Sequence, residues 1–436
     1  YILMSNEKVK QGTSRRQFIK TSGALAVAGS FMSQAPFILT GKAAYAGTLK
    51  IGLIGCGGRG IGAAIQALRA DPNTELVAMG DVFDFRAKPA LEQLKSNEAL
   101  ASRVKVTPDT LFVGLDAYKK VIDCVDVVLL ATPPGFRPIH LEYAVEKGKH
   151  VFCEKPMAVD ATGYRQALAA AHKAKEKNLS LIAGFCWRYS TCERELMKRV
   201  LAGDIGRVTS VYSAYNTGQL WCYPRQPEWS DLFYQMRNWY NFSWMSGDHI
   251  VEQACHSVDK LVWAMGDVDP VSAIAHGGRQ QRIEKQYGNI FDHFSVVYDF
   301  PDGQKGFLFC RQMNNCSGEN TDYIMGTKGI GKIAAFGHLE ITGDKPWKSK
   351  YTDDMYQLEH NVLFKSIRDA DGHNDGDWMM RSTLMAIMGR ESAYTGKRLS
   401  WDDIKNSEQK LVPDNLAWDM KLPDPPIPMP GKTEFI

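Results

Sequence analysis

The sequence predicts an α/β protein in two parts: a doubly wound parallel sheet, then an α/β region with an open, mostly antiparallel sheet. Strand-like and helix-like runs alternate through residues 47–183, as in parallel sheets whose strands are joined by crossover helices. A glycine-rich turn follows the first strand-like run. After about residue 190 apolar and polar residues alternate, which is typical of antiparallel strands with one buried face.

The glycine-rich turn lies in residues 50–60, KIGLIGCGGRG, and a helix-like run follows it. Its Gly-x-Gly-x-x-Gly pattern is typical of Rossmann dinucleotide-binding sites. Gly55 allows the tight bend, Gly57 lets the backbone approach a pyrophosphate, and Gly60 lets the helix pack on the strand. The amides at the start of the helix then face the phosphates. We expect the cofactor contacts here to come from Gly55, Gly57, Gly58, Arg59 and Gly60.

The second strand-like run, residues 75–80, ends at Asp81, where this fold places the acid that binds the ribose. Asp81 could instead cap the following helix, a role that Asp84 could also serve. An acid at this position favours NAD, because it repels a 2′-phosphate. Arg86 is close enough in sequence to accommodate that phosphate, so NADP stays open as an alternative.

The rest of the parallel sheet follows the same pattern. Strand-like runs cover 125–131, 150–154 and 179–183, and helix-like runs cover 138–147 and 161–177. Ligands of such sheets bind beyond the carboxyl ends of the strands. We therefore expect Thr132 and Pro133, after one strand, and Glu154 and Lys155, at the end of the next, to lie on the same rim as the glycine turn.

The beginning of the chain has the order of an export signal. Residues 14–20, SRRQFIK, precede a mildly apolar run over 21–39 and then the small-x-small segment 44–46. Paired arginines indicate the twin-arginine type, with the mature protein starting near Gly47. An uncleaved membrane anchor is the alternative, but glycine, serine and proline dilute the run. We expect a periplasmic or exported protein with no stable membrane insertion after cleavage, its dinucleotide loaded before export.

The charge balance and the cysteine spacing argue against nucleic acid and metal as partners. The 436 residues carry 52 basic and 49 acidic side chains, a balance that gives no reason to expect nucleic acid. The nine cysteines form neither a Cys-x-x-Cys pair nor a cluster with histidine at metal spacing. We expect no bound metal.

Taken together, the leader, the glycine turn, Asp81, the Glu-Lys-Pro motif at 154–156 and the segment EQACHSVD at 252–259 resemble the glucose-fructose oxidoreductase, inositol dehydrogenase and rhizopine-catabolism family, Gfo/Idh/MocA. The resemblance implies an N-terminal Rossmann domain, a C-terminal α/β domain and oxidation or reduction of sugars or cyclitols with NAD or NADP. It places Lys155 beside nicotinamide and substrate. It also implies roles for His256 and for Glu252, where the family usually has aspartate.

The chemistry of these side chains agrees with that reaction. Removing a hydride from a carbinol carbon requires a base for the hydroxyl proton. Desolvation and a positive nicotinamide would lower the pKa of Lys155 towards neutrality, whereas His256 starts there, so either could be the base. If residues 248–260 form one helix, Glu252, His256 and Asp259 share a face. The alternatives are a surface lysine and a core histidine.

An aromatic belt precedes this segment and suits a carbohydrate site, because sugar C–H faces stack on aromatic rings. Its members are Trp221, Tyr223, Trp229, Phe233, Tyr234, Trp239, Tyr240, Phe242 and Trp244. Simple core or interface packing is the alternative for each ring. We expect Trp239 and Tyr240, with Arg188 and Tyr189, to contact the substrate.

The sequence thus predicts a leader at 1–46, a Rossmann domain at 47–183, a substrate-binding and oligomerisation domain at 184–400, and an extended Pro-rich tail at 401–436. The predicted function is an NAD(P)-dependent oxidoreductase acting on a sugar, glycoside or cyclitol hydroxyl, with retained cofactor. The alternative is an NAD-dependent glycoside hydrolase using transient redox, similar to α-N-acetylgalactosaminidases that lack the Glu-Lys-Pro lysine. A cofactor-binding sensor or structural subunit is a third class. Resemblance implies a homo-oligomer.

Overall fold

A computed structural model describes residues 45–436. The leader predicted for residues 1–46 therefore lies almost entirely outside the described residues. Among the described helices, none combines the length and apolar character needed to cross a membrane.

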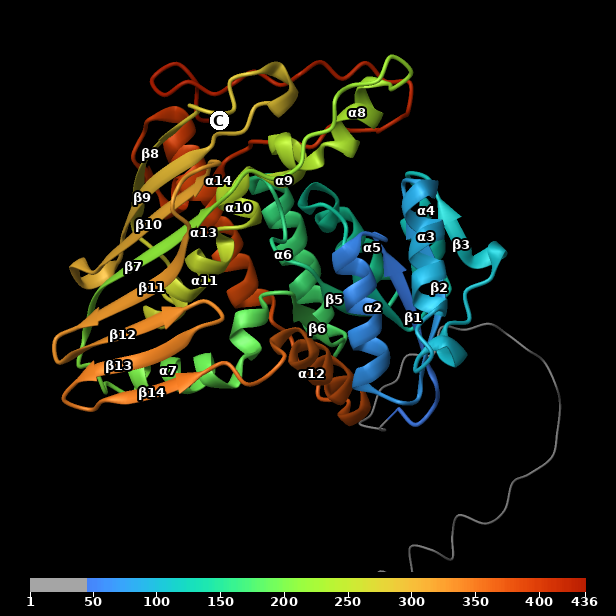
Figure 1. The fold of residues 1–436 in the computed structure, drawn as a ribbon, viewed down its shortest axis with the longest axis horizontal. Helices are drawn as coiled ribbons and strands as arrows, with labels where there is room; N and C mark the ends of the chain where they lie inside the picture. The colour runs from blue at the N-terminus through green and yellow to red at the C-terminus, as the bar shows by residue number, and fades with distance from the viewer. Residues whose placement is uncertain (1–44) are drawn as a thin grey trace, which may run out of the picture. The chain divides into compact units, whose positions relative to one another are not determined.

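The first sheet has six parallel strands in the order β3-β2-β1-β4-β5-β6, which confirms the predicted doubly wound sheet (Figure 1). Its strands are β1 (Leu49–Ile54), β2 (Thr74–Asp81), β3 (Leu111–Val113), β4 (Val127–Leu130), β5 (His150–Cys153) and β6 (Leu181–Ala183). The connecting helices are α2 (Gly58–Ala70), α3 (Asp84–Lys95), α4 (Ala117–Asp123), α5 (Arg137–Glu146) and α6 (Ala161–Glu176). The inner strands are almost wholly apolar because helices cover both faces of the sheet.

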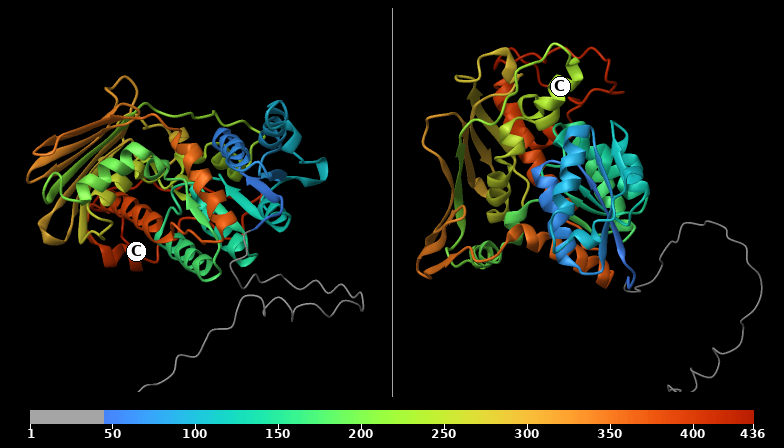
Figure 2. Two further views of the ribbon diagram at one scale, coloured as in Figure 1. Left: turned by 90° about the horizontal axis from the view of Figure 1, so that it is seen from below. Right: turned by 45° about the vertical axis from the view of Figure 1, so that its right-hand side comes forward.

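The second sheet has nine strands in the order β14-β13-β12-β11-β7-β10-β9-β8-β15. Its strands are β7 (Val208–Thr217), β8 (Ser272–Gly278), β9 (His293–Asp299), β10 (Lys305–Gln312), β11 (Glu319–Gly326), β12 (Gly329–Ala334), β13 (His338–Gly343), β14 (Trp347–Lys350) and β15 (Leu399–Ser400). Only the β7–β10 pair is parallel, so the prediction of a mostly antiparallel sheet is confirmed. Helices cover one face, and burial alternates along β9 accordingly (Figure 2).

The remaining helices connect or cover these sheets. They are α7 (Thr191–Leu201), α8 (Asp231–Arg237), α9 (Ser243–Ser246), α10 (His249–Glu252), α11 (Cys255–Ala264), α12 (Met355–Asp369), α13 (Gly376–Thr395) and α14 (Trp401–Asn406). Among the single-turn 3₁₀ helices, η4 (Cys186–Tyr189) and η5 (Trp239–Asn241) bear on the site described below.

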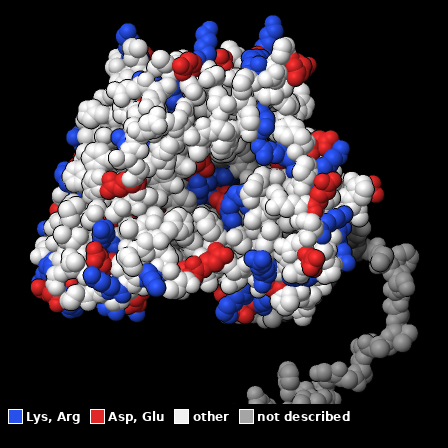
Figure 3. Space-filling model, in the orientation of Figure 1, with Lys and Arg blue, Asp and Glu red and all other residues white. Residues whose placement is uncertain are grey.

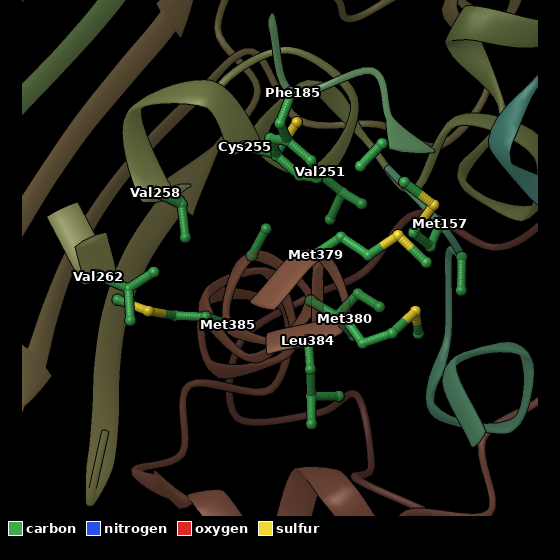
Figure 4. Close-up of a cluster of buried hydrophobic side chains, with 14 of the residues drawn as sticks. Met157, Phe185, Val251, Cys255, Val258, Val262, Met379, Met380, Leu384 and Met385 are labelled. Carbon is green, nitrogen blue, oxygen red and sulfur yellow. The ribbon is translucent and has the colours of Figure 1, made fainter. Parts of the chain in front are cut away.

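Helix α13 joins the cores of the two sheets. It is buried on nearly every side, as expected of a helix that is apolar all round. Its methionines and leucine pack against side chains from both parts of the chain (Figure 4). These neighbours are Met157 from the loop after β5, Phe185 from the segment after β6, and Val251, Cys255, Val258 and Val262 from α10 and α11.

Helix α12 belongs by sequence to the second part but packs on the first sheet. Its Leu363, Phe364 and Ile367 are buried in the same cluster as Leu53 and Phe152. The tail also differs from the prediction, because Trp401–Asn406 form a helix capped by the Ser400 side chain, and the irregular segment starts only after it.

Candidate active site

One cavity of about 1320 Å³ lies between the two parts of the chain. The turn after β1, the ends of β2, β4 and β5, and helices α10 and α11 all line it. The volume exceeds the roughly 300–1,000 Å³ of ordinary small-molecule pockets, as a dinucleotide plus a substrate requires. The space-filling view shows a deep hollow with basic and acidic atoms inside it (Figure 3).

The three motif glycines have different surroundings. Gly55 has a φ of 94°, which permits the tight turn. A Cβ on Gly60 would lie 1.9 Å from the Gly55 carbonyl oxygen, so only glycine allows α2 to approach β1 this closely. A Cβ on Gly57 or Gly58 would meet no atom within 4 Å. Both residues line the cavity at the start of α2, where the fold places a diphosphate.

Asp81 lines the same cavity at the end of β2. Its Oδ2 accepts a hydrogen bond from the Cys56 amide at 2.7 Å, and its Oδ1 accepts one from the Phe83 amide at 2.9 Å. Burial raises the pKa of the Asp81 carboxyl despite these bonds. The carboxylate is thus tied to the glycine turn, where a ribose-binding acid belongs, and α3 begins only at Asp84.

Arg59 connects the glycine turn to the Glu-Lys-Pro loop and to α12. Its guanidinium forms ion pairs with Glu154 and, at 2.6 Å, with Glu359. It also lies 5.0 Å from the ring centre of Tyr356. Burial raises the pKa of Glu359 well above its ordinary value, whereas Glu154, despite its own burial, has a lowered pKa because of Arg59, Lys155 and Arg137. The arginine charge is therefore balanced mainly by Glu154.

Lys155 lies in the cavity with its ammonium against α10. It donates to the Glu252 backbone oxygen and lies 3.0 Å from Oε1 of the same residue. Burial alone would lower the pKa of Lys155, but Glu252, Cys255 and Glu154 together raise it above its ordinary value. The Glu252 carboxylate, which the sequence argument did not include, therefore acts on the pKa of Lys155 in the direction opposite to burial.

The single helix predicted over 248–260 is two helices with a break at Gln253. Glu252 and His256 both line the cavity, but Asp259 does not. Asp259 instead binds Arg188 at 2.9 Å. Burial, then the charges of Lys155, Lys260 and Arg59, lower the pKa of His256 well below its ordinary value, so its imidazole is neutral at neutral pH.

Three of the four residues expected at the substrate lie elsewhere. Arg188 is held by Asp259 and Asp267 and stacks on Trp378. Tyr189 is buried and donates to Asp375. Tyr240 is buried and accepts from Gln312 at 2.9 Å. Of the four, only Trp239 lines the cavity.

The loop after β4 carries the remaining predicted contacts. Thr132 and Pro133 line the cavity, and Thr132 Oγ1 lies 3.3 Å from His140 Nδ1. Buried Arg137 donates to the Thr132 carbonyl at 2.7 Å and to the Pro156 carbonyl. It therefore fixes the two loops relative to each other. Our sequence reasoning missed Arg137, although a charged residue at a helix start beside a strand end is a usable signal.

Several other residues that line the cavity could not be predicted from the local sequence. Tyr215 comes from the end of β7, Gln253 from the helix break, Tyr356 from α12, and residues 410–416 from the tail. Among residues 45–436, no group of three or more His, Cys, Asp or Glu side chains could hold a metal ion.

Two family models match the chain consecutively. Residues 49–185 match the oxidoreductase family with an NAD-binding Rossmann fold, and residues 194–331 match the GFO/IDH/MocA C-terminal domain. The chain belongs to the Gfo/Idh/MocA family. Residues 49–185 are thus the NAD-binding domain of a family of oxidoreductases.

The curated relatives of this Gfo/Idh/MocA chain are distant. A 2,7-anhydro-N-acetylneuraminate hydratase from Escherichia coli is 26% identical over 53% of this chain and 58% of its own. An inositol 2-dehydrogenase from Ralstonia nicotianae is 29% identical over 52% of this chain and 57% of its own. The chain thus spans less than two thirds of the length of these relatives.

Solved structures show the same fold. The aldose-aldose oxidoreductase from Caulobacter crescentus, complexed with glycerol, has a TM-score of 0.64 at 18% identity, over 81% of this chain and 99% of its own. A levoglucosan dehydrogenase with NADH and levoglucosan has a TM-score of 0.63 at 19% identity, over the same shares.

Proposed function

We propose that this protein is an NAD-dependent oxidoreductase that acts on a hydroxyl group of a sugar, glycoside or cyclitol. The observation that carries the proposal is one cavity that is lined both by Gly57 and Gly58 of the glycine turn and by Lys155, Glu252 and His256. The glycine turn suits a diphosphate. The three ionisable side chains suit transfer of a proton to or from a carbinol hydroxyl. Relatives named as inositol dehydrogenases support a polyhydroxylated substrate.

The fit to NAD rests on the glycine turn, on Asp81 and on the rim loop with Thr132 and Pro133. Bound NAD supplies a hydride acceptor. Charged Lys155 stabilises negative charge that develops on the substrate oxygen. His256 lines the cavity with a neutral imidazole and is the proposed acceptor of the hydroxyl proton. Glu252 keeps Lys155 charged and accepts a bond from a neighbouring hydroxyl.

The residues that line the cavity from the second part of the chain favour a carbohydrate substrate. Trp221, Tyr223 and Trp239 line it from the second part of the chain. Their rings offer flat apolar faces, while Gln253 and Tyr215 offer hydrogen-bonding groups. That mixture suits a ring with C–H faces and equatorial hydroxyls.

A redox-neutral reaction is the second candidate. Its support is the relative named as a hydratase, because adding water does not change the oxidation state of the substrate overall. The NAD-dependent glycoside hydrolase belongs to the same class. Retention of Lys155 favours the dehydrogenase.

One experiment separates the candidates. The purified protein is denatured to release and identify bound nucleotide, and nucleotide absorbance is then followed against sugars, cyclitols and aryl glycosides. Reduced nucleotide with a ketone product supports the dehydrogenase. Aglycone release without net nucleotide change supports the hydrolase, and absence of any dinucleotide affinity contradicts both.

We also propose that the chain is exported by the twin-arginine route, is not anchored in the membrane afterwards, and acts in the periplasm as a homo-oligomer. Arg15 and Arg16 support the route. Substituting both with lysine should abolish export, measured by cell fractionation. Sedimentation of the exported protein tests the oligomer.

A further inference from the structure

Near Asp81 the cavity adjoins aromatic residues that are far apart in the sequence. Four aromatic rings from three segments pack together there: Phe83 and Phe85 at the start of α3, Phe233 of α8 and Trp418 of the tail. Of the four, Phe83 lines the cavity, and the other three pack around it. We call this group the aromatic clasp. Ring centres are 4.9 Å apart for Phe83 and Phe233, 6.0 Å for Phe83 and Trp418, and 6.3 Å for Phe233 and Trp418.

The clasp adjoins the predicted ribose site directly. The Phe83 amide donates to Asp81, and Phe83 itself lines the cavity. Arg237, from the same helix as Phe233, also lines the cavity. Its guanidinium lies 3.8 Å from the ring centre of Tyr223 and 5.1 Å from that of Phe85. Aromatic and cationic groups therefore link the two parts of the chain at this end.

The tail is held on both sides of the cavity. The Leu411 amide donates to Asp160 Oδ2 at 2.6 Å, which ties the tail to the first part of the chain. At the other end Gln235 of α8 donates to the Leu422 carbonyl at 2.9 Å, and the Leu422 amide donates to Asp231 at 3.2 Å. Between these anchors, residues 412–416 line the cavity. Figure 1 shows the red tail beside α8.

We propose that this strap, residues 411–422, and the aromatic clasp form the second wall of the dinucleotide site and retain its adenosine end between turnovers. The inference rests on the proposed NAD-dependent function. The fold places the ribose at the acid after β2, so the adenosine end lies beside Asp81, next to Phe83 and to residues 412–416 of the strap.

The strap differs from a surface tail in what it covers. Trp418 is 37% exposed, and its ring packs on Phe83 and Phe233, which come from the two different parts of the chain. Leu411, Val412, Leu416, Met420 and Leu422 pack on the same buried cluster as Phe83 and Phe136. The strap therefore contacts both parts of the chain beside the cavity, which a tail that only covers the surface does not require.

The test compares release of dinucleotide from three forms of the protein. Wild type, Trp418→Ala and the control Phe336→Ala are loaded with NADH, and release into excess NAD is followed by NADH fluorescence. Phe336 is 68% exposed in the second part and does not line the cavity. Loss of the ring contacts of Trp418 should speed release about tenfold, while Phe336→Ala should match wild type. Turnover with saturating NAD should be unchanged in the Phe336→Ala control, which lies outside the proposed binding site.

Equal rates of NADH release from wild type and Trp418→Ala would contradict the proposed role of the aromatic clasp. They would not contradict the proposed function. No dinucleotide binding by wild type would overturn both. If Trp418→Ala does not fold, Phe233→Leu removes the central ring and keeps an apolar side chain. NADH release from Phe233→Leu must then be faster than from wild type, and an unchanged rate would overturn the proposal.

Discussion

The ammonium group of Lys155 lies 3.0 Å from Oε1 of Glu252, although 97 positions separate the two residues. Their side chains are only 12% and 14% exposed, so the pair is largely withdrawn from water. The contact crosses from the rim of the first sheet to a helix of the second part. It keeps Lys155 protonated against the effect of burial.

Replacing Lys155 by alanine should remove catalysis and leave NAD binding nearly intact, because the proposed task of Lys155 is charge stabilisation at the substrate oxygen. We expect kcat to fall by about 10²–10³-fold. Lys175→Ala is the matched control, since that side chain is 67% exposed in α6. Turnover and NAD affinity are measured separately, and full turnover of Lys155→Ala would contradict the assignment.

Replacing Glu252 by glutamine should move the alkaline limit of activity to lower pH. The carboxylate raises the pKa of Lys155 and burial lowers it, so burial prevails once the charge is lost. If protonated Lys155 is required, activity disappears as pH rises through the lowered pKa. The measurement is kcat/KM from about pH 6 to about 11. Higher activity of the variant near neutrality would instead show neutral Lys155 acting as the base.

Two glycine substitutions should separate folding from cofactor binding. Gly60→Ala places a Cβ against the Gly55 carbonyl and should lower the free energy of unfolding by about 1–3 kcal/mol or more. Gly57→Ala meets no protein atom, so stability should hold while NAD binding weakens. Thermal unfolding and NAD titration measure the two effects. A Gly57→Ala variant that binds NAD normally would argue against the diphosphate site.

Glu359 should matter as a hydrogen-bond acceptor more than as a charge. Burial raises its pKa well above the ordinary value, and its Oε1 accepts from Arg59 at 2.6 Å. Glu359→Ala should lower the free energy of unfolding by about 1–3 kcal/mol, because a buried donor loses its partner. Glu359→Gln keeps an acceptor and should stay close to wild type. Equal losses in chemical denaturation of both variants would show that the charge itself is needed.

Local sequence predicted the first sheet and its rim well. The glycine turn, Asp81, and the loops with Thr132 and Lys155 follow directly from strands, and parallel strands bring their carboxyl ends together. The substrate side was predicted less well. The i, i+4, i+7 argument assumed one continuous helix, but the break at Gln253 turns Asp259 away from the cavity and towards Arg188.

The sequence by itself determined the alternation of strands and helices in the first sheet, the glycine turn and the acid that follows β2, because each depends on residues close together in the chain. Only the tertiary structure decided that α12 carries Glu359 to Arg59, that Arg188 serves the core, and that the tail reaches Phe83. Arg59 and Glu359 are 300 positions apart in the chain, and Phe83 and Trp418 are 335 positions apart. Burial of apolar surface and pairing of charges decide these contacts when the chain packs, so the local pattern of residues does not predict them.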